Sequence, residues 1–336
     1  MGIDLHARRL YVCIIDQAGD TCVHKEISEN PDKFAKLLEP YLSQVVVVVE
    51  CMHCWYRVAD FCDEIGVDFI LGHALYMKAI HGGKAKNDRI DSFKIANLIR
   101  GGNFPVAYVY PREMRATRDL LRRRMKIVRH GADLKAHVAN TTSQYNLPPN
   151  KVNLKNKSAR EQIRNTFPDP VVQRNMDLNM SILECYAKEL SKLEWFIETQ
   201  ARQHNPVHLH LLHSVTGIGR ILALTIIYEI GNIDRFESVQ TFASYSRLVK
   251  CKAESAGKSY GTQGNKIGNA HLKWAFSEAA VLYLRGNEKA QRYLQRLQKR
   301  MSKAKALSAL AHKIGRCVYF MLKNETVFDE SKFLTG

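Results

Sequence analysis

The sequence predicts an α/β domain at the N-terminal end, followed by long helices of coiled-coil type and then by a mainly α-helical C-terminal domain. Residues 2–5, 10–16 and 21–27 have strand character, and residues 45–49 are five consecutive valines, which is typical of a strand buried on both faces. Helical patterns replace strand patterns after Pro111. We therefore expect domains at 1–110, 111–205 and 206–336.

The first 110 residues are expected to form a mixed sheet covered by helices. Gly19 and Asp20 supply a hairpin turn between the second and third strands, so the first three strands form an antiparallel meander. Gly101 and Gly102 end the last helix of this domain. The remaining elements are helices at 31–42, 56–65 and 88–100, and strands at 45–49 and 68–71.

The rest of the chain is expected to be helical, with two interruptions. Residues 147–170 contain four prolines and predict a linker, and residues 250–269 are rich in Gly, Ser, Lys and Asn. The helix after the linker carries apolar residues spaced by three and four, which indicates either core packing or pairing of two copies. This stripe consists of Ile182, Tyr186, Leu190, Leu193 and Ile197.

Charge is distributed unevenly along the chain. The 336 residues include 50 Lys and Arg against 33 Asp and Glu, a net charge of +17. Residues 1–91 hold 10 basic and 14 acidic residues, whereas residues 92–336 hold 40 basic and 19 acidic residues. An acidic N-terminal segment followed by a basic remainder of the chain favours a carboxylate site that acts on a polyanion. The alternative is a basic surface without a specific partner.

The sequence gives no indication of membrane insertion or secretion. Its apolar stretches are shorter than the ~18 residues that span a bilayer, and the first residues do not resemble a secretory leader. The eight cysteines lack the regular spacing of a disulfide framework. We therefore expect a cytoplasmic protein with reduced thiols and no membrane partner.

Four acidic residues are predicted to meet near one edge of the sheet. Asp4 lies in the first strand, Glu50 directly follows the valine strand, and Asp88 and Asp91 share one face at the start of a helix. Clustered carboxylates repel one another unless a hard cation such as Mg²⁺ compensates their charge. Such a site suits phosphodiester cleavage assisted by metal ions.

Three segments, in this order, resemble the DEDD transposases, the insertion-sequence family that also includes the pilin-gene-inverting recombinases. They are GIDLH, VVVVVE and KAKNDRIDSFKIANLI. The resemblance implies a ribonuclease-H-like (RuvC-like) fold for 1–110, with Asp4, Glu50, Asp88 and Asp91 as catalytic metal ligands. The element from 87 to 91 is the most specific, and Lys84 and Lys86 before it are expected to bind nucleic acid.

The resemblance continues into the C-terminal half. Residues 214–236 look like a helix-hairpin-helix, in which the backbone amides of Gly217 and Gly219 contact a phosphate, the alternative being a tight turn between two core helices. The family also has a Gly- and Lys-rich segment that supplies a catalytic serine. Ser255 is the matching position, with Ser259 as the second choice of register and Lys258 as a nucleic-acid contact.

A basic segment between the two halves is expected to hold nucleic-acid backbone, or else to be a solvated helical face. Its candidate contacts are Arg112, Arg115, Arg118, Arg122, Arg123 and Arg124. The family resemblance implies recombination of donor and target DNA guided by a structured non-coding bridge RNA. It also implies a dimer or tetramer in a bacterial or archaeal cytoplasm, associated with the nucleoid.

Two other functions fit the same residues. A Holliday-junction-resolvase-like nuclease uses the four carboxylates with water as the nucleophile, so Ser255 is dispensable. An inactive DNA- or RNA-binding relative keeps the basic residues of 92–336 and does not need the four acidic residues.

Overall fold

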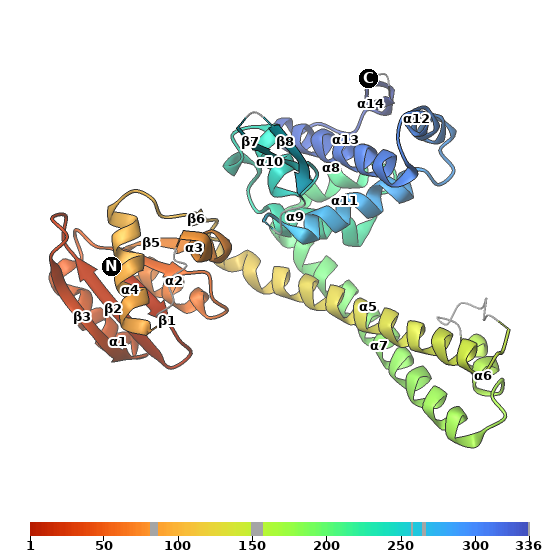
Figure 1. The fold of residues 1–336 in the computed structure, drawn as a ribbon, viewed down its shortest axis with the longest axis horizontal. Helices are drawn as coiled ribbons and strands as arrows, with labels where there is room; N and C mark the ends of the chain where they lie inside the picture. Colours follow the sequence, from red (N-terminus) through yellow and green to blue (C-terminus); the bar gives the residue numbers. More distant parts are fainter. Residues whose placement is uncertain (81–86, 149–156, 257, 264–266, 335–336) are drawn as a thin grey trace. The chain divides into compact units, whose positions relative to one another are not determined.

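The computed structural model describes residues 1–80, 87–148, 157–256, 258–263 and 267–334. It divides into two compact units, an N-terminal unit of Met1–Arg112 and a C-terminal unit of Glu113–Gly336. Figure 1 traces both units along the chain.

The N-terminal unit is built on a mixed six-stranded sheet with the strand order β3-β2-β1-β4-β5-β6. Strands β1, β2 and β3 form the expected antiparallel meander, while β4 and β5 run parallel to β1. The last strand, β6, is antiparallel to β5 and was not expected from the sequence. The bounds are β1 Gly2–Leu5, β2 Arg9–Ile15, β3 Thr21–Ser28, β4 Val46–Glu50, β5 Asp68–Gly72 and β6 Val106–Ala107.

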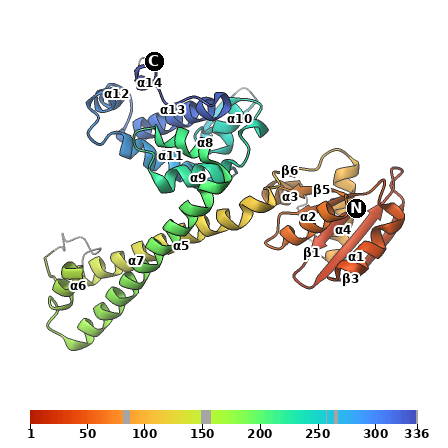
Figure 2. The same ribbon diagram turned by 180° about the vertical axis from the view of Figure 1, so that it is seen from behind.

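Helices cover both faces of this sheet. The helices are α1 Pro31–Leu38, α2 Trp55–Glu64, α3 Ala74–Ile80 and α4 Asp88–Arg100. Ile3 and Val49 pack with α1 and α2 on one face, whereas Val48 packs with α3 and α4 on the other. The two opposite views show α4 on one side of the sheet and α1 and α2 on the other (Figures 1 and 2).

Two details differ from the predicted elements of this unit. The helix expected at 31–42 ends at Leu38 and continues as a short 3₁₀ turn, Glu39–Tyr41, because Pro40 has no amide hydrogen to donate. Helix α3 was not predicted, since its seven residues are too few to show a clear helical period.

Two long helices open the C-terminal part of the chain and lie side by side in both views (Figures 1 and 2). They are α5 Arg112–Gln144 and α7 Pro170–His204, and a Cβ on Gly131 of α5 would lie 3.8 Å from Leu183 of α7. The segment expected to be a linker contains a helix, α6 Lys157–Arg164. Ile163 of α6 is buried against α7, so that part of the linker prediction was wrong.

The rest of the C-terminal unit is mainly helical, as predicted, around one apolar core. Leu224, Phe242, Phe276 and Val318 in this core are fully buried. The Gly-rich interruption forms a hairpin of β7 Cys251–Ser255 and β8 Lys258–Gln263. The helices are α8 Pro206–His213, α9 Arg220–Ile230, α10 Val239–Tyr245, α11 Ala270–Tyr283, α12 Glu288–Gln298, α13 Lys303–Asn324 and α14 Glu330–Leu334, with a 3₁₀ turn at Ile233–Arg235.

The apolar stripe of α7 packs at least partly within the chain. Ile197 is fully buried in the core of the C-terminal unit, and Leu193 packs against that core. Tyr186 lies close to Gly131 of α5. In the part of the chain that the structure describes, no helix combines the length and apolar character needed to span a membrane.

Candidate metal centre and nucleic-acid interface

Two neighbouring strands bring Asp4 and Glu50 to one face of the sheet. The parallel register pairs Gly2 with Val48 and Ile3 with Val49, so Asp4 and Glu50 follow at the next position of each strand. Because side chains alternate between faces, both residues share the face of Val48, which is the face covered by α4. The sequence prediction for Glu50 rested on its position at the end of a strand, and that for Asp4 on its place in the first strand.

Helix α4 lies close to β1 and carries the other two acids in its first turn. A Cβ on Gly2 would collide with the α4 backbone at Ser92 and Ala96, so only glycine permits this approach. The Asn87 side chain accepts a hydrogen bond from the Ile90 amide at 2.9 Å and thereby fixes the helix start. Asp88 and Asp91 follow directly, where the helix dipole stabilises negative charge.

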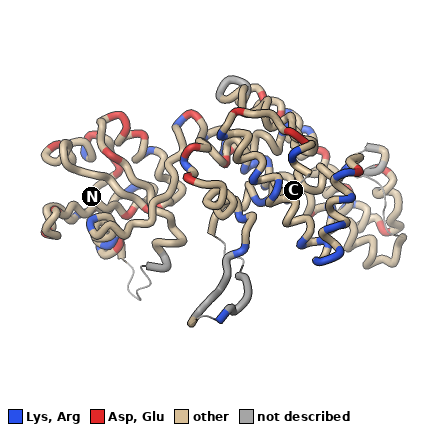
Figure 3. Tube along the Cα trace, turned by 90° about the horizontal axis from the view of Figure 1, so that it is seen from above, with Lys and Arg blue, Asp and Glu red and all other residues tan. Residues whose placement is uncertain are grey.

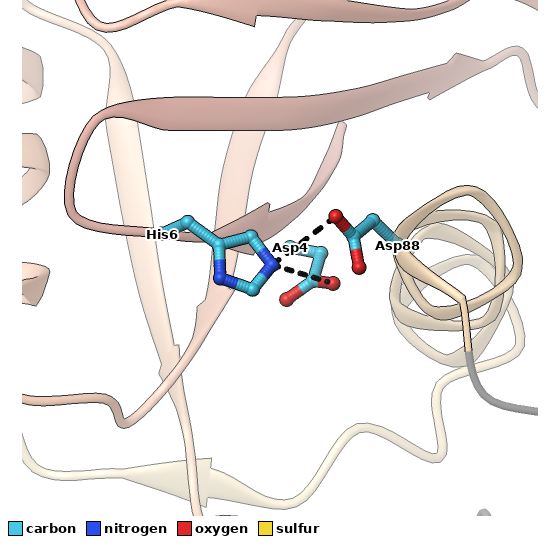
Figure 4. Close-up of side chains that lie close together, drawn as sticks. All are labelled: Asp4, His6 and Asp88. Carbon is cyan, nitrogen blue, oxygen red and sulfur yellow. Dashed lines mark ion pairs between the residues drawn. The ribbon is translucent and has the colours of Figure 1, made fainter.

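Asp4, His6 and Asp88 form a compact cluster (Figure 4). His6 Nε2 lies 3.5 Å from Asp4 Oδ2 and 3.3 Å from Asp88 Oδ2. One possible ligand atom from each residue lies within 4.8 Å of the others. The Asp4 side chain is 22% exposed, against 49% for His6 and 52% for Asp88, so the cluster opens to solvent.

The electrostatics of the cluster suit a cation. Burial raises the pKa of the Asp4 carboxyl, the His6 charge opposes this, and the negative charges of Asp88 and Asp91 raise the pKa further. Asp91 therefore acts on Asp4 through its charge, although its nearest ion-pair partner is Lys94, at 3.7 Å. Two carboxylates and an imidazole at this spacing fit a divalent cation.

A surface pocket of about 410 Å³ lies beside the cluster. Arg8 places positive charge near Asp88, which suits an anionic backbone approaching a metal centre, whereas Arg9 pairs with Glu26 at 3.2 Å. The pocket is lined by His6, Ala7, Arg8, Arg9, Glu26 and Asp88.

Most of the arginines expected to contact nucleic acid take part in ion pairs within their own unit. Arg112 lies 3.6 Å from Asp60 and 3.1 Å from Glu64 in the N-terminal unit. On α5, Arg118 and Arg122 pair with Glu229, Arg124 pairs with Glu194, and Arg115 is buried. Arg123 is exposed, as are Lys126 and Arg129 on the same helix. Basic residues are frequent along the C-terminal unit (Figure 3).

Glu229 is a carboxylate inside the core of the C-terminal unit, with 1% of its side chain exposed. It accepts hydrogen bonds from Arg118 at 3.1 Å, from Arg122 at 2.6 Å and 2.9 Å, and from Asn269 at 2.8 Å. Burial raises the pKa of Glu229, but the Arg122 hydrogen bond and the charges of both arginines outweigh it, so the pKa is lowered overall.

The turn expected to bind phosphate connects α8 to α9. Gly217 has a φ of +89°, and a Cβ there would lie 2.6 Å from the backbone nitrogen of Tyr283 in α11, so close packing explains this glycine. Gly219 caps α9 and faces open space. Of these two glycines, Gly217 is therefore the one whose side-chain position is filled by a packed neighbour.

The β7–β8 hairpin carries the predicted serine segment. Ser255 is the last residue of β7 and pairs with Lys258, while Ser259 pairs with Glu254. Lys258 is exposed. Lys84 and Lys86 lie outside the described residues.

The comparisons with known proteins agree with one another. Residues 1–147 match a transposase family model of the DEDD, IS110 type, and residues 209–295 match the "Transposase IS116/IS110/IS902 family". The chain belongs to the IS110 family of transposases. A curated relative of this IS110-family chain, y4qE of Sinorhizobium fredii (strain NBRC 101917 / NGR234), carries the word transposase in its name. It is 24% identical over 237 residues, which cover 68% of this chain and 55% of the relative, so the chain matches about half of that protein's length.

In this IS110-family chain, the structure brings together some of the predicted acids and adds residues that the sequence did not single out. Asp4 and Asp88 meet, with Asp91 in electrostatic range, whereas Glu50 shares their face without belonging to the compact cluster. His6 was missed because a single histidine after a strand has no periodic signal. Glu229 was missed because its partners lie far away in the sequence.

Proposed function

We propose that this chain is the transposase of an insertion sequence, and that it cleaves and rejoins DNA with Asp4, Glu50, Asp88 and Asp91 as catalytic residues. The Asp4–His6–Asp88 cluster carries the proposal, because it places two carboxylates of the family's acidic set beside a surface pocket that Arg8 also lines. The family match supports transposase activity. The strand order β3-β2-β1-β4-β5, with β2 antiparallel, supports a ribonuclease-H-like (RuvC-like) fold.

The acidic residues hold Mg²⁺ in this proposal. Asp4 and Asp88 supply carboxylate oxygens, with Asp91 and Glu50 on the same face, and His6 lies within reach of both aspartates. A bound Mg²⁺ offsets negative charge on the scissile phosphate and lowers the pKa of an attacking hydroxyl. Arg8 at the adjacent pocket orients the DNA backbone by attraction to its phosphates.

Ser255 is the proposed nucleophile. Its oxygen forms a bond to a DNA phosphorus, the bond from that phosphorus to the leaving sugar oxygen breaks, and the serine proton is released. The resulting phosphoserine conserves a phosphodiester bond for rejoining. Bringing two DNA duplexes together requires more than one protomer, so a dimer or tetramer is part of the proposal, and the serine can come from either copy.

Sequence choice is delegated to a structured guide RNA in this proposal. The exposed cations of α5, including Arg123, suit sequence-independent contacts with an A-form backbone. Residues 214–236 serve as a helix-hairpin-helix, with the Gly219 amide as its phosphate contact.

A cleavage assay analysed on denaturing gels tests the proposal. With Mg²⁺, DNA and the RNA transcribed next to the gene, the wild type should form a protein–DNA adduct that Ser255→Ala abolishes. Ser259→Ala is the register control. Asp88→Ala should lose cleavage while retaining RNA binding, and wild-type cleavage by this variant would refute the carboxylate assignment.

The same assay separates the two alternatives. A resolvase-like nuclease cleaves DNA without an adduct and tolerates Ser255→Ala, and the fact that the compact acidic cluster lies entirely within the N-terminal unit favours it as the second candidate. An inactive relative binds nucleic acid and cleaves nothing.

A further inference from the structure

Glu229 has no role in the proposed chemistry, yet the burial of its carboxylate costs folding free energy. It lies near the end of α9 among apolar neighbours and is 1% exposed. A carboxylate loses much of its hydration when buried, and only well-formed partners offset that loss. Its partners therefore indicate what the residue does.

Two of these partners come from the basic helix α5. Arg118 and Arg122 are four residues apart and so share one helix face. Arg122 contacts both oxygens of Glu229, through Nε at 2.6 Å and Nη2 at 2.9 Å. Glu229 thereby holds this face of α5 against the core, while the neighbouring Arg123 is exposed.

The third partner, Asn269, lies where the chain returns from the β7–β8 hairpin to α11. Its Nδ2 donates to Glu229 at 2.8 Å, and its Oδ1 accepts from the amides of His271 at 2.9 Å and Leu272 at 3.1 Å. Both ends of this side chain are therefore used, one to cap α11 and the other to hold Glu229.

Residues 267–269 follow the hairpin in the sequence and are here called its base; they are attached to the core at neighbouring points. The Asn269 amide donates to the Tyr245 carbonyl at 2.6 Å, and Arg247 Nε donates to the Ile267 carbonyl at 3.0 Å. A Cβ on Gly268, which has a φ of +94°, would lie 2.6 Å from the same Tyr245 oxygen. Residues 267–269 therefore lead into α11 along a closely packed path.

We propose that Glu229 is a positioning residue that joins the basic helix α5 to the base of the Ser255 hairpin. Through Glu229, the face of α5 that binds nucleic acid and the segment that carries the serine are held at a fixed spacing. The inference rests on the proposed role of Ser255, and it assigns Glu229 and Asn269 no contact with the reacting atoms.

Two single variants and their combination test this role in the full-length protein. Glu229→Gln removes the charge that holds both arginines, and Asn269→Asp sets a second carboxylate against Glu229. The combined variant exchanges the two groups, so that one carboxylate, one amide and the α11 cap are all retained. Glu194→Gln is the matched control, because it also removes a carboxylate partner of an α5 arginine, at 2.8 Å, but one located on α7.

Hydrogen exchange of the hairpin amides measures anchoring directly, at a temperature where circular dichroism shows every variant folded. We expect exchange in β7 and β8 to accelerate about tenfold in each single variant and to return toward the wild-type rate in the combined variant. Glu194→Gln should leave hairpin exchange unchanged. Wild-type exchange rates in both single variants would overturn the proposal, as would a combined variant that restores nothing.

Adduct formation is the second readout. The single variants should lose at least about tenfold in the rate of adduct formation with little change in nucleic-acid affinity, because misplacing a reacting group by 1 Å costs on the order of 100-fold. Equal adduct rates in wild type and single variants would contradict the positioning role. If the wild type forms no adduct, the function of Ser255 fails, and the hydrogen-exchange comparison still decides whether Glu229 anchors the hairpin.

Discussion

At the scale of single residues, the candidate metal centre depends on like charges held close together. The negative charges of Asp88 and Asp91 act on Asp4, which is the most buried member of the cluster. His6 lies between the carboxylates of Asp4 and Asp88, where its ring reduces the repulsion between them. A divalent cation attracts both carboxylates, so the metal-free protein should carry a repulsion between them that a bound metal relieves.

Asp4→Asn should therefore stabilise the metal-free protein, by a few tenths of a kcal/mol up to about 1 kcal/mol. The same change should remove most of the stabilisation that Mg²⁺ gives the wild type, which is about 2.7 kcal/mol at a concentration 100 times Kd. Thermal melts with and without Mg²⁺ measure both effects. Asp68→Asn, an exposed acid outside the cluster, is the control, and an equal response of both variants would argue against a metal at Asp4.

Glu229 makes a prediction about pH. Because its folded-state pKa is lowered, its contribution to stability is present above the ordinary value of 4.5 and is lost as the pH falls through the folded-state value. Glu229→Gln should reduce the free energy of unfolding by roughly 1.5–3 kcal/mol at pH 7, the range for hydrogen bonds to charged groups. Urea titrations should show this difference shrinking as the pH falls below 4.5. If the difference in the free energy of unfolding does not change with pH, Glu229 stabilises the fold through its packing and not through its charge.

At the scale of secondary structure, α5 has two kinds of arginine that the sequence could not separate. Arg118, Arg122 and Arg124 face acidic residues within the C-terminal unit, whereas Arg123 is exposed. Charge counts along a helix predict a basic segment but not which cations have partners, since those partners are on other helices.

Replacing the exposed α5 cations Arg123, Lys126 and Arg129 with alanine should weaken nucleic-acid binding and flatten its salt dependence. The slope of log K against log salt should fall by up to about 0.9 for each duplex phosphate that the variant no longer neutralises. Fluorescence anisotropy at several salt concentrations measures the slope. Arg124→Ala, which removes the Glu194 ion pair, should reduce stability and leave the salt slope nearly unchanged.

The elements of the sheet were predictable because their signals are local. The valine run 45–49, the hairpin turn at Gly19 and the cap at Asn87 each fix an element through neighbouring residues. Asp4 and Asp88 could be predicted to meet because strand order and helix start follow from those elements. Helix α6 and the short β6 have weak local patterns and depend on packing, and Glu229 depends on partners that are 40 or more positions away in the sequence.

At the scale of the whole molecule, each unit has its own apolar core. Among the described residues, the clusters on the two faces of the sheet belong to the N-terminal unit, and the large cluster around Phe242 and Phe276 belongs to the C-terminal unit. Each core therefore has the means to fold independently.

A fragment of residues 1–112 should fold alone and bind Mg²⁺, because both sheet faces and the Asp4–His6–Asp88 cluster lie within it. Circular dichroism should show a cooperative melt, and added Mg²⁺ should raise the melting temperature. A fragment without a cooperative transition would show that the sheet needs the C-terminal unit for stability. The fragment should form no covalent DNA adduct, since Ser255 is absent from it.

The hydrogen bond from the Asn269 amide to the Tyr245 carbonyl, at 2.6 Å, closes residues 246–268 into an excursion whose two ends meet. Ser246 and Leu248, at the start of this excursion, still pack into the core, so the part that can change length begins after Leu248. Doubling the length of a flexible loop costs only about 0.6 kcal/mol in closure entropy. Insertions after Leu248 should therefore cost the fold little stability, while they should change the position of Ser255 and so lower its rate of adduct formation.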